Sequence, residues 1–160
     1  MKKWIAAIMF VVLVAFDQIT KWIAKINLQG KEPISLIDGI LEFHYLEGGN
    51  TGAAFGLFKG KTAILALISL VVFLVLVIAF IKLSKKKENY WLSFSIVLMA
   101  SGALGNCIDR LFYHSVIDFI YFKIINFPIF NIADCYVTIS AILIFLIVAF
   151  SKEEENNDGK

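Results

Sequence analysis

The sequence predicts an all-α integral membrane protein with four transmembrane helices and a small extracytoplasmic β-sheet subdomain. Of its 160 residues, 59% are hydrophobic and 18% are charged, and the mean hydropathy is +0.80. The apolar residues occur in long blocks rather than in an amphipathic rhythm, which is typical of a membrane protein. One connection between these blocks instead shows the alternation of apolar and polar residues that is typical of a strand.

Each long apolar block predicts one spanning helix, because about 20 apolar residues cross a hydrocarbon core of about 30 Å. Residues 63–81 and 90–108 each contain no charged residue. We expect the four helices to cover residues 4–26, 62–82, 90–109 and 132–150.

The lysines set the expected orientation. Lys2 and Lys3 precede the first block, and four more lysines crowd the connection between the second and third blocks. Because cytoplasmic loops are enriched in Lys and Arg, we expect both termini to be cytoplasmic. No small-residue cleavage pattern follows the first block, so we expect a retained helix rather than a removed signal. Residues 1–151 then form one membrane-embedded domain, followed by a flexible cytoplasmic tail of residues 152–160.

The outer connection, residues 27–61, is too long to be a bare link between helices. Leu41, Phe43 and Tyr45 alternate with polar residues, which predicts a half-buried strand. We therefore expect a small sheet of short strands resting on the outer surface. Phe55 follows in a segment of small residues, and we interpret it as an interfacial anchor rather than a substrate contact.

Four aspartates lie inside or against the hydrophobic stretches, namely Asp17, Asp109, Asp118 and Asp134. Ionisable groups at membrane depth are costly, so each one marks a functional-site hypothesis. At a rise of about 1.5 Å per residue, three of them lie about 20 to 30 Å from the cytoplasmic ends of three separate helices. This shared depth indicates a single site near the outer face of the membrane.

Local spacing adds amides to these acids. Asn106 precedes Asp109 by three residues, and Asn131 precedes Asp134 by the same interval. On a helix this spacing places amide and carboxylate on one face. Gly102 lies on the same helical stripe as Asn106, and a small residue there favours close packing of a neighbouring helix.

Structural alternatives exist for some of these residues. Asp109 with Arg110 is also the pattern of an ion pair that anchors a helix end. Asp17 and Lys21 are four residues apart, so they can pair with each other, or Lys21 can extend its ammonium group to the interface. For the other two aspartates a purely structural interpretation has less support, because few cations are near them in the sequence.

Other functional classes find less support. The two histidines lack metal-ligand spacing, and no phosphate-binding loop, nucleophile elbow or Cys/His pair is present. We interpret Cys107 and Cys135 as small hydrophobes without a disulfide. A net charge of +2 gives no indication of nucleic-acid binding. The alternatives are a proton- or cation-coupled transporter, which would spread its acids through the membrane depth, a Mg²⁺-dependent membrane phosphotransferase, and a purely structural membrane protein.

Five short blocks carry a resemblance to a known family: residues 17–21 (DQITK), 50–56 (NTGAAFG), 102–110 (GALGNCIDR), 116–119 (VIDF) and 130–134 (FNIAD). Together, and in this order, they resemble lipoprotein signal peptidase, the bacterial signal peptidase II family. They span nearly all of the membrane-embedded chain. Gly48 and Gly49, directly before the second block, depart from the family pattern and leave the path of the loop open.

The resemblance implies an aspartic endopeptidase of the bacterial cytoplasmic membrane without metal or cofactor, acting near the outer face. Its substrates would be diacylglyceryl-modified prolipoproteins, cut before the lipidated cysteine, and we expect a monomer among membrane lipids that binds no nucleic acid. The matching motifs place Asp118 and Asp134 at the catalytic positions. The supporting or substrate-binding positions are Asp17, Lys21, Asn50, Gly102, Asn106, Asp109, Arg110 and Asn131.

The chemistry also follows from the residue types. Two neighbouring carboxylates do not both ionise cheaply, so the pair holds one proton near neutral pH. The charged member can then deprotonate a water molecule, while the protonated member donates to the carbonyl oxygen and later to the leaving amine. Nearby amides can orient this pair or stabilise developing charge.

Overall fold

The computed structural model describes residues 1–53, 57–83 and 90–157, with backbone only for residues 151–157. Phe55 lies outside the described residues, so its assignment as an interfacial anchor stays a prediction. In chain order the elements are α1 (Lys3–Leu28), β1 (Ile34–Ile37), β2 (Leu41–Phe43), α2 (Thr62–Leu83), α3 (Tyr90–Tyr113), β3 (Ile120–Phe122), the short 3₁₀ helix η2 (Lys123–Ile125) and α4 (Ile132–Asn157).

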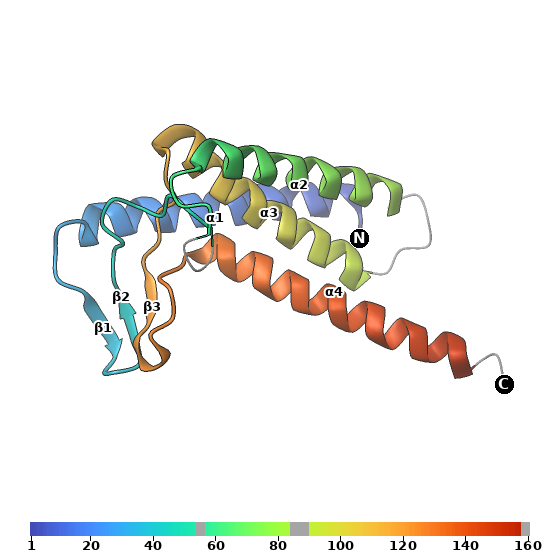
Figure 1. The fold of residues 1–160 in the computed structure, drawn as a ribbon. Helices are drawn as coiled ribbons and strands as arrows, with labels where there is room; N and C mark the ends of the chain where they lie inside the picture. Colours follow the sequence, from blue (N-terminus) through green and yellow to red (C-terminus); the bar gives the residue numbers. More distant parts are fainter. Residues whose placement is uncertain (54–56, 84–89, 158–160) are drawn as a thin grey trace.

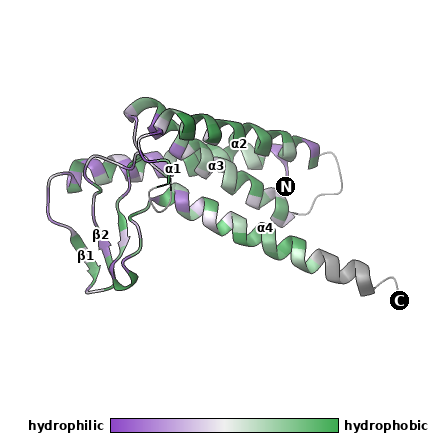
Figure 2. Ribbon diagram, in the orientation of Figure 1, coloured by the Kyte–Doolittle hydropathy of each residue, from purple (hydrophilic) through white to green (hydrophobic). Residues whose placement is uncertain are grey.

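The four α-helices are all long and apolar enough to cross a membrane, which confirms the predicted fold class. Helix α3 contacts each of the other three (Figure 1). Of its most apolar 18-residue window, 67% is buried, against 11 to 17% in the other helices. Because α3 is enclosed by protein, it can carry polar side chains, whereas α2 is hydrophobic along almost its whole length (Figure 2).

A three-stranded antiparallel sheet lies at the end of the bundle where α1 ends and α4 begins (Figure 1). The strand order is β1-β2-β3, so β2 is central. The third strand comes from the segment between α3 and α4, outside the connection from which we predicted the sheet. Beyond β2 the chain continues beside the segment that precedes β3, where Leu46 N–H donates to the Asp118 carbonyl at 3.0 Å. This pairing joins the sheet to a predicted catalytic residue.

The predicted burial of β2 was wrong in detail. Leu41 and Phe43 are partly exposed, whereas Glu42 between them is only 8% exposed. Lys123, which follows β3, forms an ion pair with the Glu42 carboxylate at 2.7 Å. Because β2 is the central strand, Glu42 meets Lys123 from the segment that follows the neighbouring strand β3. The alternation of residues along β2 alone does not reveal this partner.

Two helices are longer than the apolar patterns predicted. Helix α3 continues one turn beyond residue 109 to Tyr113. Helix α4 continues to Asn157, so most of the segment predicted as a flexible tail is helical. Residues 152–155 are Lys and Glu, which have high helix propensity, so the helix does not stop where the apolar residues do.

Helices α1 and α4 approach α3 closely at two glycines. A Cβ atom on Gly102 would lie 2.5 Å from the Ala133 carbonyl oxygen, and one on Gly105 would lie 2.5 Å from Asp17 Oδ2. Real side chains do not tolerate such distances, so both positions require glycine. The close packing predicted for this helical stripe is present, and it brings α1 and α4 together over one stretch of α3.

Candidate active site

Helix α1 contributes a fully buried ion pair to the interior of the bundle. The Lys21 ammonium lies 2.9 Å from Asp17 Oδ2 and 3.1 Å from Asp109 Oδ2, and all three side chains are at most 1% exposed. Asp109 therefore pairs with Lys21 across two helices, and the alternative of an Asp109–Arg110 anchor at the helix end was wrong. Gln18 donates to Asp109 Oδ1 at 3.0 Å and was not among the predicted site residues.

Asn106 on α3 connects this cluster to the predicted catalytic acids. Lys21 donates to Asn106 Oδ1 at 3.0 Å, and Asn106 Nδ2 donates to Asp134 Oδ1 at 2.8 Å. The Asn131 amide also donates to Asn106 Oδ1, at 3.0 Å. Two donors on the oxygen leave the Asn106 amino group directed at Asp134.

Asn131 is the N-cap of α4 rather than a residue of its first turn. Asp134 N–H donates to Asn131 Oδ1 at 3.0 Å, and Asn131 N–H donates to Asp134 Oδ2 at 3.1 Å. This reciprocal pair is a capping box, with Asp in the place of the usual Glu or Gln. The three-residue spacing that we interpreted as one helix face is thus a helix start, where a negative charge is favoured by the helix dipole.

Asp118 lies in the extended segment between α3 and β3 and is 1% exposed. Its Oδ1 accepts a hydrogen bond from Asn131 Nδ2 at 2.7 Å, and its Oδ2 accepts one from Asn50 Nδ2 at 2.9 Å. Burial raises the pKa of the Asp118 carboxyl from 3.8 to about 7, and the negative charge of Asp134 adds to this rise. Asp118 therefore holds a proton more readily than an ordinary aspartate.

Two backbone amides complete the arrangement. Asp17 Oδ1 accepts a hydrogen bond from Ala133 N–H at 2.9 Å, and Asp109 Oδ2 accepts one from Ile117 N–H at 3.1 Å. Backbone contacts of this kind leave no signal in residue type or spacing, so the sequence could not have predicted them.

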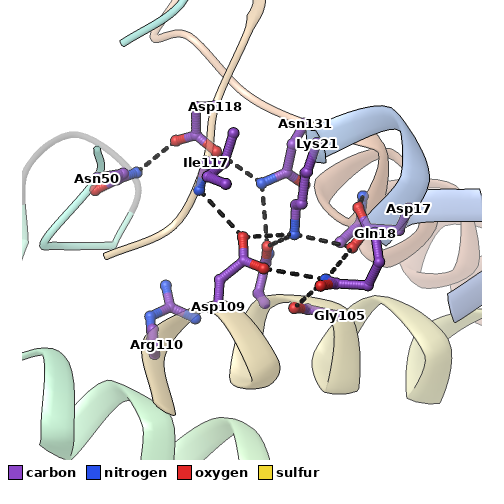
Figure 3. Close-up of polar contacts among 12 residues, drawn as sticks. Asp17, Gln18, Lys21, Asn50, Gly105, Asp109, Arg110, Ile117, Asp118 and Asn131 are labelled. Carbon is purple, nitrogen blue, oxygen red and sulfur yellow. Dashed lines mark hydrogen bonds and ion pairs between the residues drawn. The ribbon is translucent and has the colours of Figure 1, made fainter. Parts of the chain in front are cut away.

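Eight of the ten predicted site residues form one continuous hydrogen-bonded network, shown in part in Figure 3: Asp17, Lys21, Asn50, Asn106, Asp109, Asp118, Asn131 and Asp134. Gly102 instead lets α4 approach α3. Arg110 donates to the Gly52 carbonyl and to Ser69 Oγ, both at 3.3 Å. Among the described residues its buried Nε has no hydrogen-bond partner.

These features define a class of protein: a multi-pass membrane protein with two amide-coordinated carboxylates, Asp118 buried and Asp134 partly buried, toward the end of the bundle that bears the sheet. Within residues 1–53, 57–83 and 90–150, no group of three or more His, Cys, Asp or Glu side chains is arranged to hold a metal ion.

Comparison with known proteins identifies the family. Residues 9–150 match the family model described as signal peptidase (SPase) II. A lipoprotein signal peptidase of Streptococcus agalactiae is 38% identical over 159 residues, covering 99% of each chain, and one of Clostridium tetani is 41% identical over 156 residues, covering 96% of each. The chain belongs to the signal peptidase II family and is therefore a membrane peptidase that processes lipoproteins.

Solved structures agree with this assignment. One described as a bacterial membrane enzyme at 2.3 Å resolution has a TM-score of 0.81 and 35% identity, and the match covers 96% of this chain and 92% of the other. A second, at 1.9 Å resolution, has a TM-score of 0.78 and 34% identity, covering 91% and 93%. Family and fold together describe a multi-pass protein of the bacterial cell membrane and decide against the transporter, phosphotransferase and purely structural alternatives.

Proposed function

We propose that this protein is an aspartic endopeptidase that removes the signal peptide from diacylglyceryl-modified prolipoproteins, cutting before the lipidated cysteine. The proposal rests above all on Asn131, which contacts both Asp118 and Asp134 within 3.1 Å. A single residue in contact with both carboxylates requires that they lie close together. Such a pair can hold one proton between a base and an acid.

The contacts of the two acids differ and suggest their roles. Both oxygens of Asp134 accept N–H groups, from Asn106 and from the Asn131 backbone, at the start of a helix. These donors and the helix dipole stabilise negative charge. Asp118, whose pKa is raised to about 7, is suited to carry the shared proton. Asp134 is then the general base and Asp118 the general acid.

The reaction follows from this assignment. Asp134 removes a proton from water as the water oxygen attacks the carbonyl carbon of the scissile peptide bond. Asp118 donates its proton to the carbonyl oxygen, which gives a neutral tetrahedral diol. The C–N bond then breaks, the proton held by Asp134 goes to the leaving amine, and a diol proton returns to Asp118. The pair is restored to its starting state without a covalent intermediate.

Arg110 is suited to hold the substrate backbone. Its guanidinium already donates to the Gly52 carbonyl, whereas its buried Nε has no partner among the described residues. This N–H group can donate to a peptide carbonyl at little cost, because it gives up no existing protein contact. We therefore propose that Arg110 binds a backbone carbonyl of the prolipoprotein, and that Asn50 positions both the loop and Asp118.

The lysine distribution supports the remaining parts of the proposal. Lys2, Lys3 and the lysines of the connection after α2 favour cytoplasmic termini, and hence acids near the outer face. A membrane-anchored substrate and water meet at that interface. We propose a monomer among membrane lipids, since a single chain suffices to supply hydrogen-bond donors to both acids.

The test is a cleavage assay with the purified protein and a diacylglyceryl prolipoprotein, run with and without excess EDTA. Asp118→Asn and Asp134→Asn should each lower kcat by about 1,000-fold or more while the protein stays folded. The unaltered protein should keep its activity in chelator. Near-normal turnover in either variant removes that residue from the catalytic pair, and loss of activity in EDTA contradicts the metal-free mechanism.

A further inference from the structure

Lys21 is a buried cation that the proposed reaction does not use. Its side chain is 1% exposed and forms no ion pair with Asp118 or Asp134 within the described part of the chain. Burying an ammonium group is costly unless carboxylates and hydrogen-bond acceptors surround it. Lys21 has three such partners, Asp17, Asp109 and Asn106, between 2.9 and 3.1 Å away.

The two carboxylates bound by Lys21 each hold one backbone amide. Asp17 accepts Ala133 N–H at 2.9 Å, and Asp109 accepts Ile117 N–H at 3.1 Å. Ala133 directly precedes Asp134 in the chain. Ile117, likewise, directly precedes the other catalytic acid, so the ion cluster fixes the backbone beside both members of the pair.

The third partner of Lys21 acts on the same pair through a side chain. Lys21 donates to Asn106 Oδ1, and the amino group of Asn106 donates to Asp134 Oδ1 at 2.8 Å. An ammonium group only donates hydrogen bonds, so the Asn106 amide can face Lys21 only with its oxygen. If the amide turned over, its amino group would face Lys21 and Asp134 would lose its donor.

We propose that Lys21 is the positioning residue of the catalytic pair, setting the separation and hydrogen bonding of two acids that it does not touch. The inference rests on the proposed function, because it takes Asp118 and Asp134 as the catalytic groups. The Lys21 ammonium contacts the Asp17 and Asp109 carboxylates, which accept the backbone N–H groups of the residues before Asp134 and Asp118. It also donates to Asn106, whose amino group donates to the proposed base. Figure 3 shows Lys21 among these partners.

Such a role makes a kinetic prediction that a purely structural role does not. Small displacements of reacting groups cost catalysis about 100-fold without weakening substrate binding. Lys21→Met keeps the length of the side chain and removes its charge and its donors. Its kcat should fall by about 100-fold or more, while KM stays within about threefold of the unaltered value.

A matched control is one turn further along α1. Lys25 lies outside the cluster, with its ammonium 4.8 Å from the centre of the Tyr113 ring. Lys25→Met removes the same charge from the same helix and should leave kcat unchanged. If both variants lose kcat equally, the effect belongs to the charge of α1 and the inference is wrong.

A second variant covers the case in which Lys21→Met does not fold. Lys21→Met combined with Asp17→Asn and Asp109→Asn removes the cation and both charges that it neutralises. The new amide oxygens can still accept the Ala133 and Ile117 N–H groups. The thermal midpoint of unfolding should return toward that of the unaltered protein. The kcat should stay about 100-fold low, because no cation joins the two carboxamides and Asn106 Oδ1 keeps only the Asn131 amide as a donor.

The outcomes separate this inference from the proposed function. Recovery of kcat together with stability in the triple variant shows that Lys21 only balances charge, and it overturns the inference while leaving the catalytic pair intact. Normal kcat in Lys21→Met does the same. Activity that survives in Asp118→Asn or Asp134→Asn instead overturns the proposed function, and the inference falls with it.

Discussion

The bundle holds two groups of acids whose carboxylates have different kinds of partner. Asp17 and Asp109 share the ammonium of Lys21, whereas Asp118 and Asp134 are held by amide and backbone N–H donors alone in the part of the chain that the structure describes. A buried cation beside an acid favours its charged form, because the ammonium group stabilises the negative charge. An acid held by neutral donors beside a second acid can take up and release a proton. On the proposed mechanism, the first group serves structure and the second serves catalysis.

The largest expected effect contrasts the two groups directly. Asp109→Leu removes one of the two carboxylates that contact Lys21 and leaves the Ile117 N–H without its acceptor, so it should lower the free energy of unfolding by about 3–5 kcal/mol. Asp118→Asn removes a carboxylate that is costly to bury beside another one, so stability should stay equal or rise while activity is lost. Chemical unfolding in detergent micelles measures both variants. If both variants were destabilised equally, the two groups of acids would not differ in their contribution to stability.

The next effect concerns the packing that brings the groups together. Gly102→Ala places a methyl group 2.5 Å from the Ala133 carbonyl oxygen, and a backbone atom cannot turn away as a side chain can. The variant should lose about 1–3 kcal/mol of stability and some activity, because α4 carries Asp134. The control is Met99→Ala, one turn earlier on α3, which removes bulk instead of adding it. A fully stable Gly102→Ala enzyme would show that α4 has room to move.

The pH dependence should separate the groups further. Asp118 binds its proton more tightly in the folded protein than in the unfolded chain, where its pKa is near 3.8. Its stabilising contribution is therefore complete below that value and is lost as pH rises toward about 7. Asp118→Asn should therefore reduce the pH dependence of the free energy of unfolding between pH 4 and 8 (about the range of the two pKa values). For the unaltered enzyme, kcat should decline by about tenfold per pH unit above neutrality, because the general acid loses its proton.

The smallest effect is expected on the sheet. The Glu42–Lys123 ion pair lies on the sheet, with the Lys123 side chain 53% exposed. Solvent screens such a pair, so Glu42→Gln should leave activity unchanged and the thermal midpoint nearly so. A large loss of activity here would place the sheet within the substrate-binding machinery.

The sequence predicted the four spans and the polar residues of the site because both depend on residue type. The free-energy cost of placing a carboxylate inside an apolar block can be recognised from the sequence alone. The partners of these acids depend on which helices meet. Asp109 stands beside Arg110 in the chain, yet it pairs with Lys21 across the bundle.

The remaining errors have a related origin. Asn131 and Asp134 have a spacing that fits both a helix face and a helix cap, and only the start of α4 decides between them. Strand β3 follows α3 and completes a sheet whose other strands come from an earlier connection. Its three residues are too few to show a period.

The hydrogen bond from Ala133 to Asp17 joins residues 116 positions apart, at opposite ends of the chain. A ribosome delivers the first helix to the membrane long before the last one exists. Until then, one oxygen of Asp17 has no backbone donor and Asp134 has not yet been made. On the proposed mechanism, in which Asp134 is the general base, the protease stays inactive until its final span enters the lipid and supplies that acid.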